Sequence, residues 1–286
     1  MITTRIFTAY ESFSACSLLT GLFLSSLSIF KTKRTYNAPR DDPRVIRQRF
    51  MGVGLSCILS TIVLYVLFAY KGRKQTLSQL AWLMGLRIDH LLISTICPLI
   101  LTASLFLGPL VVNGVEGRLP FQRNWTWRGH VQDFAKDLRT WRTYFVGPVV
   151  EEWVFRACMI PVMYAGGWSK SGIILITPLL FGAGKFIGCT EGHERPLLEP
   201  YKELLSYTTL FGWYTSFLFM RTGHLAGPTV SHVFCNIMGL PDFGAALRPS
   251  RYRNVYAASY LLGITGFTYL LFAFTTPSWY GGAYWT

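Results

Sequence analysis

Long apolar runs separated by short basic segments dominate the first 113 positions of the chain. Residues 13–30 contain no charged side chain over 18 positions, and residues 50–70 contain none over 21. Residues 90–113 are apolar after the first position. Because a helix needs about 20 mostly apolar residues to cross the hydrocarbon core of a bilayer, this pattern predicts three membrane-spanning helices.

From Tyr144 onward the apolar runs become shorter, and glycine, proline and ionisable residues interrupt them. Only helices and closed barrels satisfy every backbone group within lipid, and these runs are too long and continuous for barrel strands. The chain is therefore predicted to be an all-α polytopic membrane protein with about eight transmembrane helices. The five later spans are expected at residues 144–165, 171–189, 205–220, 228–240 and 256–275.

Two segments between the spans are expected to lie outside the hydrocarbon core. Residues 75–87 are typical of a short interfacial helix, and residues 114–143 form a polar loop whose segment 131–141 is amphipathic. The pattern predicts one integral membrane domain over residues 1–286. It comprises N-terminal spans (1–113), the polar loop with a surface helix (114–143) and a functional helix bundle (144–275).

Composition and charge agree with a membrane protein. Hydrophobic residues make up 51% of the 286 positions and charged residues only 14%, whereas soluble domains carry about 25% charged residues. The net charge of +13 indicates basic loops facing an anionic leaflet, and no soluble basic face suggests a nucleic-acid partner.

The distribution of basic residues predicts the orientation in the membrane. Residues 31–49 carry seven basic side chains and residues 114–143 carry six, against four in residues 71–87. The positive-inside rule places the first two segments in the cytosol. Asn124, in an Asn-Trp-Thr sequon, is then expected to stay unglycosylated.

The stretch "GPVVEEWVFR" (147–156) places ionisable side chains in a predicted span. Each costs roughly 2.5–3.5 kcal/mol at the centre of a spanning helix unless it is paired or faces a water-filled cavity. Glu152 and Arg156 are four residues apart and can form an ion pair, which is the plain structural interpretation. Glu151 is rotated by about 100° from Glu152 and needs another partner or a cavity, which favours a functional role. Gly147-Pro148 predicts that the helix begins here.

A second polar pair lies in "GHLAGPTVSHVFCNIMGLP" (223–241), where His232 and Asn236 are spaced for one face of a short helix. A lone histidine on an apolar helix is usually a satisfied core residue. An imidazole and a carboxamide one turn apart can also stabilise a developing oxyanion, which is the functional interpretation.

Taken together, Glu-Glu-x-x-x-Arg, the later His-x-x-x-Asn and the segment "RDDPRVIRQRF" (40–50) resemble the type II CAAX prenyl endopeptidases. The resemblance covers nearly the whole chain. It implies about eight helices enclosing an intramembrane cavity open to the cytosol, in the endoplasmic reticulum membrane. It also implies removal of the last three residues from farnesylated or geranylgeranylated CAAX proteins such as Ras- and Rho-like GTPases.

The same resemblance implies a role for each matching residue. Glu151 would activate a water molecule, and His232 with Asn236 would hold the tetrahedral oxyanion. Glu152, Arg156 and Phe181 would support them. No metal or other cofactor is implied.

One position departs from the family pattern. The family carries Phe-x-x-x-His where this chain has "FGAGK" (181–185), so Lys185 stands at the position of a catalytic histidine. An ammonium beside Glu151 favours the carboxylate form and weakens it as a base. His193 lies about 12 Å farther along any continuous helix and is a poor replacement. Three interpretations stay open: an altered but active site, an impaired member that still binds prenylated tails, or an error in the sequence at this position.

Other classes of function explain the sequence less well. The chain has no His-Glu-x-x-His motif, so a zinc protease would lack a strong third ligand. Broken helices with buried charges also occur in transporters, but no paired half-repeat is visible. A prenyl-binding scaffold is the more credible non-enzymatic alternative. The six cysteines are scattered beside apolar runs, which is typical of buried thiols.

Overall fold

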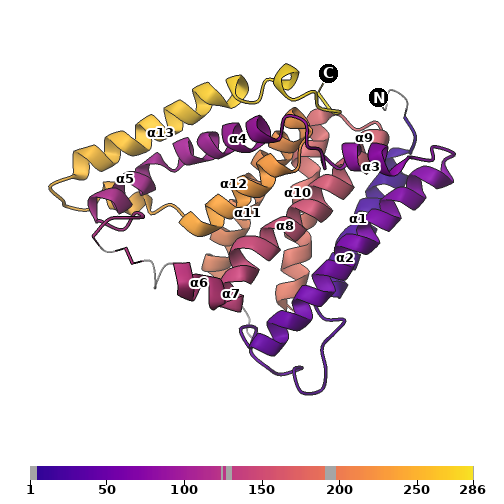
Figure 1. The fold of residues 1–286 in the computed structure, drawn as a ribbon, viewed down its shortest axis with the longest axis horizontal. Coiled ribbons are helices and arrows are strands. Elements are labelled where there is room, and N and C mark those ends of the chain that lie inside the picture. The colour runs from indigo at the N-terminus through magenta and orange to yellow at the C-terminus, as the bar shows by residue number, and fades with distance from the viewer. Residues whose placement is uncertain (1–4, 124, 127–130, 191–197, 286) are drawn as a thin grey trace.

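A computed structural model describes the backbone of residues 5–123, 125–126, 131–190 and 198–285. Within these ranges the side chains of residues 133, 183–190, 198–206 and 245 are left undescribed. The described chain is all-helical and contains no strand, which confirms the predicted fold class. Figure 1 shows the helices as a wedge, with the first and last described segments of the chain close together at one edge.

The main helices follow the predicted order along the chain. Their bounds, grouped with the short π-helical segments η2 and η3 that interrupt them, are α1 (Ala9–Ser26), α2 (Pro43–Tyr70), α3 (Leu77–Leu83), α4 (Leu91–Leu105), α5 (Leu107–Val115), α6 (Asp133–Lys136), α7 (Leu138–Trp141), η2 (Arg142–Val146), α8 (Gly147–Glu152), η3 (Trp153–Cys158), α9 (Met159–Ala165), α10 (Lys170–Thr190), α11 (Leu198–Thr222), α12 (Ala226–Met238) and α13 (Arg253–Ala273).

Each of the eight predicted spans coincides with a helix or a bent helical run. By length and hydropathy alone, α2 and α13 are able to cross a bilayer within the described part of the chain. The bent pair α4–α5 makes a third candidate if both arms belong to one span. The count of eight spans therefore stays a prediction.

Local sequence signals explain where several helices begin. The side chain of Thr8 accepts a hydrogen bond from the backbone N–H of Glu11, and the Glu11 carboxylate accepts one from the backbone N–H of Thr8, which forms a capping box at α1. Asp42 caps α2, and Pro43 occupies its first turn, where a missing N–H is harmless. The predicted interfacial helix is present as α3, with a second capping box from Thr76 to Gln79.

The 70° bend between α4 and α5 has a sequence cause. Pro109 cannot donate to the carbonyl of Leu105 and clashes with it, so the helix breaks near Phe106. After the bend α5 lies along α13 (Figure 1). A β-carbon at Gly108 would approach the Tyr260 ring to 2.4 Å, so this close packing requires glycine.

The segment from α7 to α9 is one continuous helical run, which corrects the predicted start at Gly147-Pro148. Val146 and Gly147 both have right-handed helical dihedral angles. The first side-chain cap is Asp137, which accepts from the backbone N–H of Arg139. Glu151 and Glu152 therefore lie well inside the run and not in its first turn.

Two π-helical segments interrupt this run. Pro148 and Pro161 each lack the N–H that would bond to the carbonyl four residues earlier, at Tyr144 in η2 and at Ala157 in η3. A π-helical turn is one way to absorb such a missing bond, and π-turns are frequent at functional sites.

The predicted surface helix at 131–141 is only partly formed, because α6 and α7 have four residues each and α7 continues into the run.

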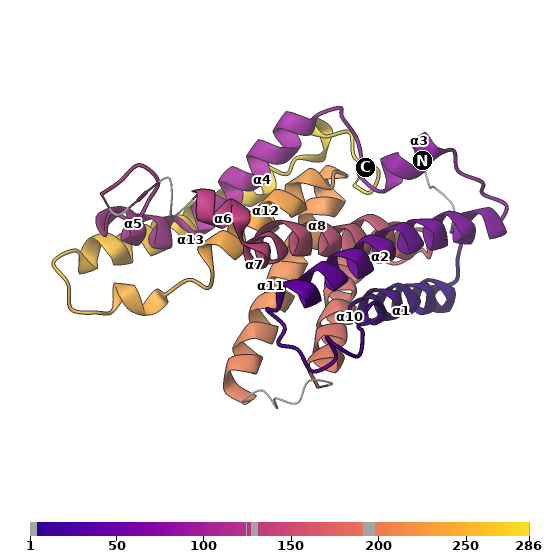
Figure 2. The same cartoon turned by 60° about the horizontal axis from the view of Figure 1, so that its bottom comes forward.

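The core surrounds this run. Residues 154–163 of η3 and α9 are all buried, and they pack against α1, α2 and α10. Within this run α8 contacts α2 and α12, and Figure 2 shows it between them.

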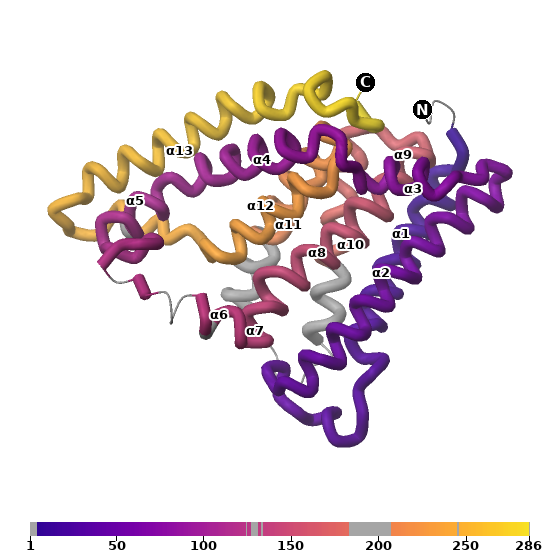
Figure 3. The backbone as a smooth tube through the Cα atoms, in the orientation of Figure 1, coloured from indigo at the N-terminus to yellow at the C-terminus, as the bar shows by residue number. Residues whose placement is uncertain are grey.

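The C-terminal segment is anchored to the loop before α4. Arg87 donates to the backbone carbonyls of Gly281 and Tyr280, and the hydroxyl of the fully buried Tyr284 donates to the carbonyl of Leu83. This places the C-terminus beside α3 and α9, as the tube in Figure 3 shows.

Candidate active site

Two adjacent glutamates on the central helical run differ sharply in exposure. The side chain of Glu152 is completely buried, whereas that of Glu151 keeps 16% of its surface exposed. The rotation of about 100° between neighbouring residues of a helix accounts for the difference. The side chain of Glu152 therefore points into the protein interior, and that of Glu151 points toward a partly exposed region.

The imidazole of His232 contacts both carboxylates. Its Nδ1 atom lies 2.8 Å from Oε1 of Glu152, which is a hydrogen bond, and its Nε2 atom lies 3.8 Å from Oε2 of Glu151. An ionised carboxylate only accepts, so the tautomer that fits this contact has the hydrogen on Nδ1, which donates to Glu152. Nε2 is thereby directed at Glu151, so these two predicted site residues face each other.

Arg156 compensates the buried charge of Glu152. Its Nε atom lies 3.2 Å from Oε2 of Glu152, a charge contact without the alignment of a hydrogen bond. Its Nη2 atom donates to Oγ1 of Thr215 at 2.6 Å and to the carbonyl of Gly212 at 3.3 Å. The predicted ion pair is therefore present, and it connects the run to α11. Because Glu152 also binds His232, the same ion pair is connected to α12.

Asn236 lies one turn beyond His232 on α12, as the spacing predicts. Its Nδ2 atom donates to the backbone carbonyl of Thr143 at 2.8 Å. A carboxamide has two N–H donors, so one bond to Thr143 leaves the second for another acceptor. The contact fixes the end of α12 against η2, just outside the glutamate pair.

Aromatic rings form the apolar wall of the site. The ring of Phe211 on α11 lies 4.9 Å from the imidazole of His232, centroid to centroid. Phe181, predicted as a supporting residue, is 5% exposed and packs on Phe155 with centroids 4.5 Å apart. It packs against the helical run that carries the glutamates.

The predicted positions Lys185 and His193 cannot be placed in this geometry. The side chain of Lys185 and the whole of His193 lie outside the described residues. The role of the lysine therefore stays a prediction.

Sequence reasoning missed the residues of α11 and η2 that hold the site. Gly212 allows the close approach of α11, because a β-carbon there would lie 2.6 Å from Pro178 and 3.4 Å from Nη2 of Arg156. Thr215 and the carbonyl of Thr143 act through single hydrogen bonds between distant segments. No periodicity or spacing in one sequence signals such partners.

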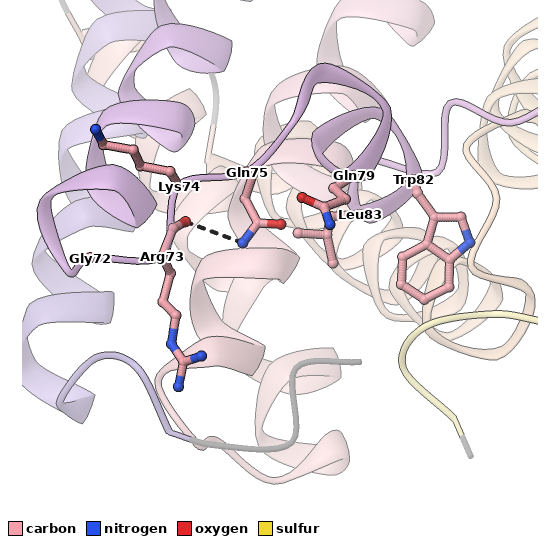
Figure 4. Close-up of a pocket in the computed structure, with 7 residues that line it drawn as sticks. All are labelled: Gly72, Arg73, Lys74, Gln75, Gln79, Trp82 and Leu83. Carbon is pink, nitrogen blue, oxygen red and sulfur yellow. Dashed lines mark hydrogen bonds between the residues drawn. The ribbon is translucent and has the colours of Figure 1, made fainter.

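A large hollow elsewhere on the surface is not this site. It has a volume of about 520 Å³ and is lined by residues of the α2–α3 connection, including Arg73, Lys74 and Trp82. Figure 4 shows the side chains of Arg73 and Lys74 pointing in different directions, so they do not converge on one ligand. The expected cavity around Glu151 stays a prediction.

Comparison with known proteins adds an independent result. The profile of the family described as type II CAAX prenyl endopeptidase Rce1-like matches residues 134–238, which include both glutamates, His232 and Asn236. Human CAAX prenyl protease 2 is 34% identical over 288 residues, covering 95% of this chain and 83% of that protein.

Two further relatives come from a plant and a yeast. CAAX prenyl protease 2 of Arabidopsis thaliana is 32% identical over 78% of this chain and 76% of its own length. The probable CAAX prenyl protease 2 of Schizosaccharomyces pombe is 30% identical over 86% and 87%, respectively. No solved structure gives a significant match.

Proposed function

Since the chain belongs to the type II CAAX prenyl endopeptidase family, we propose that it hydrolyses prenylated CAAX proteins and releases the C-terminal tripeptide. The observation that carries the proposal is the convergence of Glu151 on Nε2 of His232, at 3.8 Å, with Asn236 one turn away. The bond cut is the peptide bond that follows the prenylated cysteine.

Glu151 acts as the general base. Its Oε2 atom and Nε2 of His232 are close enough that one water molecule can lie within hydrogen-bond distance of both, at the apex of a triangle. The carboxylate takes a proton from this water as its oxygen attacks the scissile carbonyl. The partial exposure of Glu151 is consistent with access of water and substrate.

His232 and Asn236 stabilise the tetrahedral oxyanion. Asn236 offers the N–H that is not bonded to Thr143, and Nε2 of His232 becomes a donor when the ring is doubly protonated. The carboxylate of Glu152, bonded to Nδ1, stabilises that positive charge. Collapse of the intermediate breaks the C–N bond, and the departing amine takes up the proton that Glu151 removed from the water.

Glu152 and Arg156 are positioning residues. Glu152 fixes the orientation of the imidazole, and Arg156 supplies the counter-charge next to the buried carboxyl group. Glu151 as the base and Glu152 as a positioning residue thus have different roles, which explains why two consecutive glutamates occur in an apolar run.

Lys185 favours one alternative function. With lysine in place of the family's histidine, the chain would bind prenylated CAAX tails and cleave them slowly or not at all.

The substrates we propose are Ras- and Rho-like GTPases. The proposed location is the endoplasmic reticulum membrane, as a multi-pass protein with the site open to the cytosol.

The direct test uses purified protein in liposomes and a farnesylated CAAX peptide. We expect release of the free tripeptide, detected by mass spectrometry, and insensitivity to metal chelators. Chelator-sensitive release would contradict the glutamate mechanism. Binding without release would support the alternative.

A further inference from the structure

A group of charged side chains lies where the loop before α2 meets the start of the central helical run. We name it the arginine cluster, and it consists of Arg40, Arg49, Arg139 and Arg142 around Asp41. Nη1 of Arg142 lies 2.9 Å from Oδ1 of Asp41 and donates to the carbonyl of Arg40 at 3.1 Å. Nη1 of Arg139 lies 4.0 Å from Oδ2 of Asp41. Figure 1 shows α7 beside the N-terminal end of α2.

The cluster has more positive charge than Asp41 can balance. Asp41 is the carboxylate that Arg142 and Arg139 contact, and its pKa is held below the usual range mainly by the hydrogen bond from Arg142. Asp137 adds a second carboxylate near Arg139, so four guanidinium groups face two carboxylates. Such a surplus repels itself unless an anion from outside the cluster joins it.

Arg49 is the least compensated member. Its side chain is half-buried, its Nε atom is shielded from solvent, and among the described residues it makes no hydrogen bond or ion pair. The charged groups that face it are Arg40, Arg142 and Asp41. Leaving a shielded charged donor unpaired is costly, and a bound anion would remove that cost.

The cluster is joined directly to the candidate active site. Arg142 immediately precedes Thr143, and the carbonyl of Thr143 accepts the hydrogen bond from Asn236. Arg142 is therefore adjacent in the chain to the residue that holds the Asn236 carboxamide.

We propose that the arginine cluster binds the free α-carboxylate at the C-terminus of the substrate, with Arg49 as the principal donor. This inference rests on the proposed function. In an extended CAAX tail the carboxylate lies three residues beyond the scissile carbonyl, or about 10 Å at the usual rise per residue. An arginine fork matches a carboxylate in geometry and charge. Binding of the carboxylate by the cluster would thus place the bond three residues from the chain end at the site of cleavage.

The test compares a farnesylated CAAX peptide with its C-terminal amide, which lacks the negative charge. We expect the parent protein to cleave the acid with a kcat/KM at least about tenfold higher than the amide, mainly through KM. Arg49→Gln should lower kcat/KM for the acid toward that for the amide. Arg47→Gln makes the same charge change at an exposed position on the same helix and should preserve the preference.

A binding measurement separates this inference from the proposed function. In the Glu151→Gln background, fluorescence anisotropy with labelled acid and amide peptides reports recognition without turnover. Preference for the acid that is lost with Arg49→Gln supports the carboxylate site, even if the parent releases no tripeptide. Equal binding of acid and amide overturns it, whether or not the parent is active.

A lipid phosphate is the competing anion. The same binding measurement in vesicles of phosphatidylcholine alone, and with added phosphatidylserine, distinguishes the two sources. Discrimination between acid and amide in neutral vesicles supports the substrate carboxylate. An effect of Arg49→Gln that is seen only with phosphatidylserine would assign the cluster to lipid and overturn the proposal.

Discussion

The Nδ1 atom of His232 lies 2.8 Å from Oε1 of Glu152, so the second glutamate of the pair holds the imidazole and leaves Nε2 facing the first. The two carboxylates thus occupy the two ends of one ring. One is completely buried and compensated by Arg156, and the other is partly exposed. This geometry assigns structural and chemical roles to neighbouring residues, and each role can be tested separately.

Replacing Glu151 by glutamine should abolish catalysis while leaving the fold intact. The amide retains the shape of the side chain but cannot accept the proton from water. We expect tripeptide release to fall by at least about 10²-fold, the lower range for loss of a general base. The thermal midpoint in detergent should stay close to that of the parent, because the side chain is partly exposed. Full activity of this variant would remove Glu151 from the mechanism.

Replacing Arg156 by methionine should destabilise the protein strongly. Arg156 is 2% exposed, and its removal leaves Glu152 buried without a counter-charge. Breaking one partner of such a pair costs about 3–5 kcal/mol. Arg248→Met is the matched control, because Arg248 pairs with Asp242 at the surface and such pairs contribute about 1 kcal/mol or less. Chemical unfolding of both variants in detergent measures the difference, and equal losses would contradict the assignment.

Much of this architecture could be predicted from the sequence. Apolar runs of span length gave the helices, because hydrophobicity is a local property of the chain. The i, i+4 spacing predicted the pair of Glu152 with Arg156, and it placed His232 and Asn236 one turn apart. The family resemblance points to the same four positions.

The remaining features depend on contacts that the local pattern does not contain. The expected helix start at Gly147-Pro148 was wrong, because the two π-turns let the helical run pass through Pro148 and Pro161. The bond from Glu152 to His232 joins residues 80 positions apart. The bond from Asn236 to Thr143 spans 93 positions, and the approach of α11 depends on Gly212. Tertiary packing decides all of these.

Removing the carboxamide of Asn236 should slow the chemical step. We expect Asn236→Ala to lower kcat by roughly 10²–10³, the usual cost of losing one oxyanion donor. The substitution also removes the bond to Thr143, so Asn236→Asp serves as a comparison that keeps the side-chain size but loses the N–H donors. Both variants should bind the prenylated peptide with near-parent affinity. A loss of binding without a loss of kcat would place Asn236 in substrate recognition instead.

The N-cap of α2 should make stability depend on pH in the acid range. Side-chain and backbone hydrogen bonds from Arg44 lower the pKa of Asp42 from 3.8 to about 2 in the folded protein. A carboxyl with a depressed folded pKa stabilises the protein above its unfolded pKa, and this contribution is lost as the pH falls from about 4 to about 2. Asp42→Asn keeps a capping side chain that does not titrate. Its thermal midpoint should therefore fall less than that of the parent between pH 5 and pH 2.5, and parallel losses would exclude this contribution.

Changing Lys185 to histidine supplies the residue that the family resemblance implies at this position. We expect an increase in kcat, because an imidazole can take part in proton transfer with Glu151 at neutral pH. Lys185→Met is the matched control, since it removes the ammonium but supplies no imidazole. A gain with histidine alone shows that the ring is required, whereas an equal gain with methionine shows that the lysine charge was the obstacle. If the parent is faster than both variants, the lysine takes part in an altered active site, and the expectation of a defect at this position is wrong.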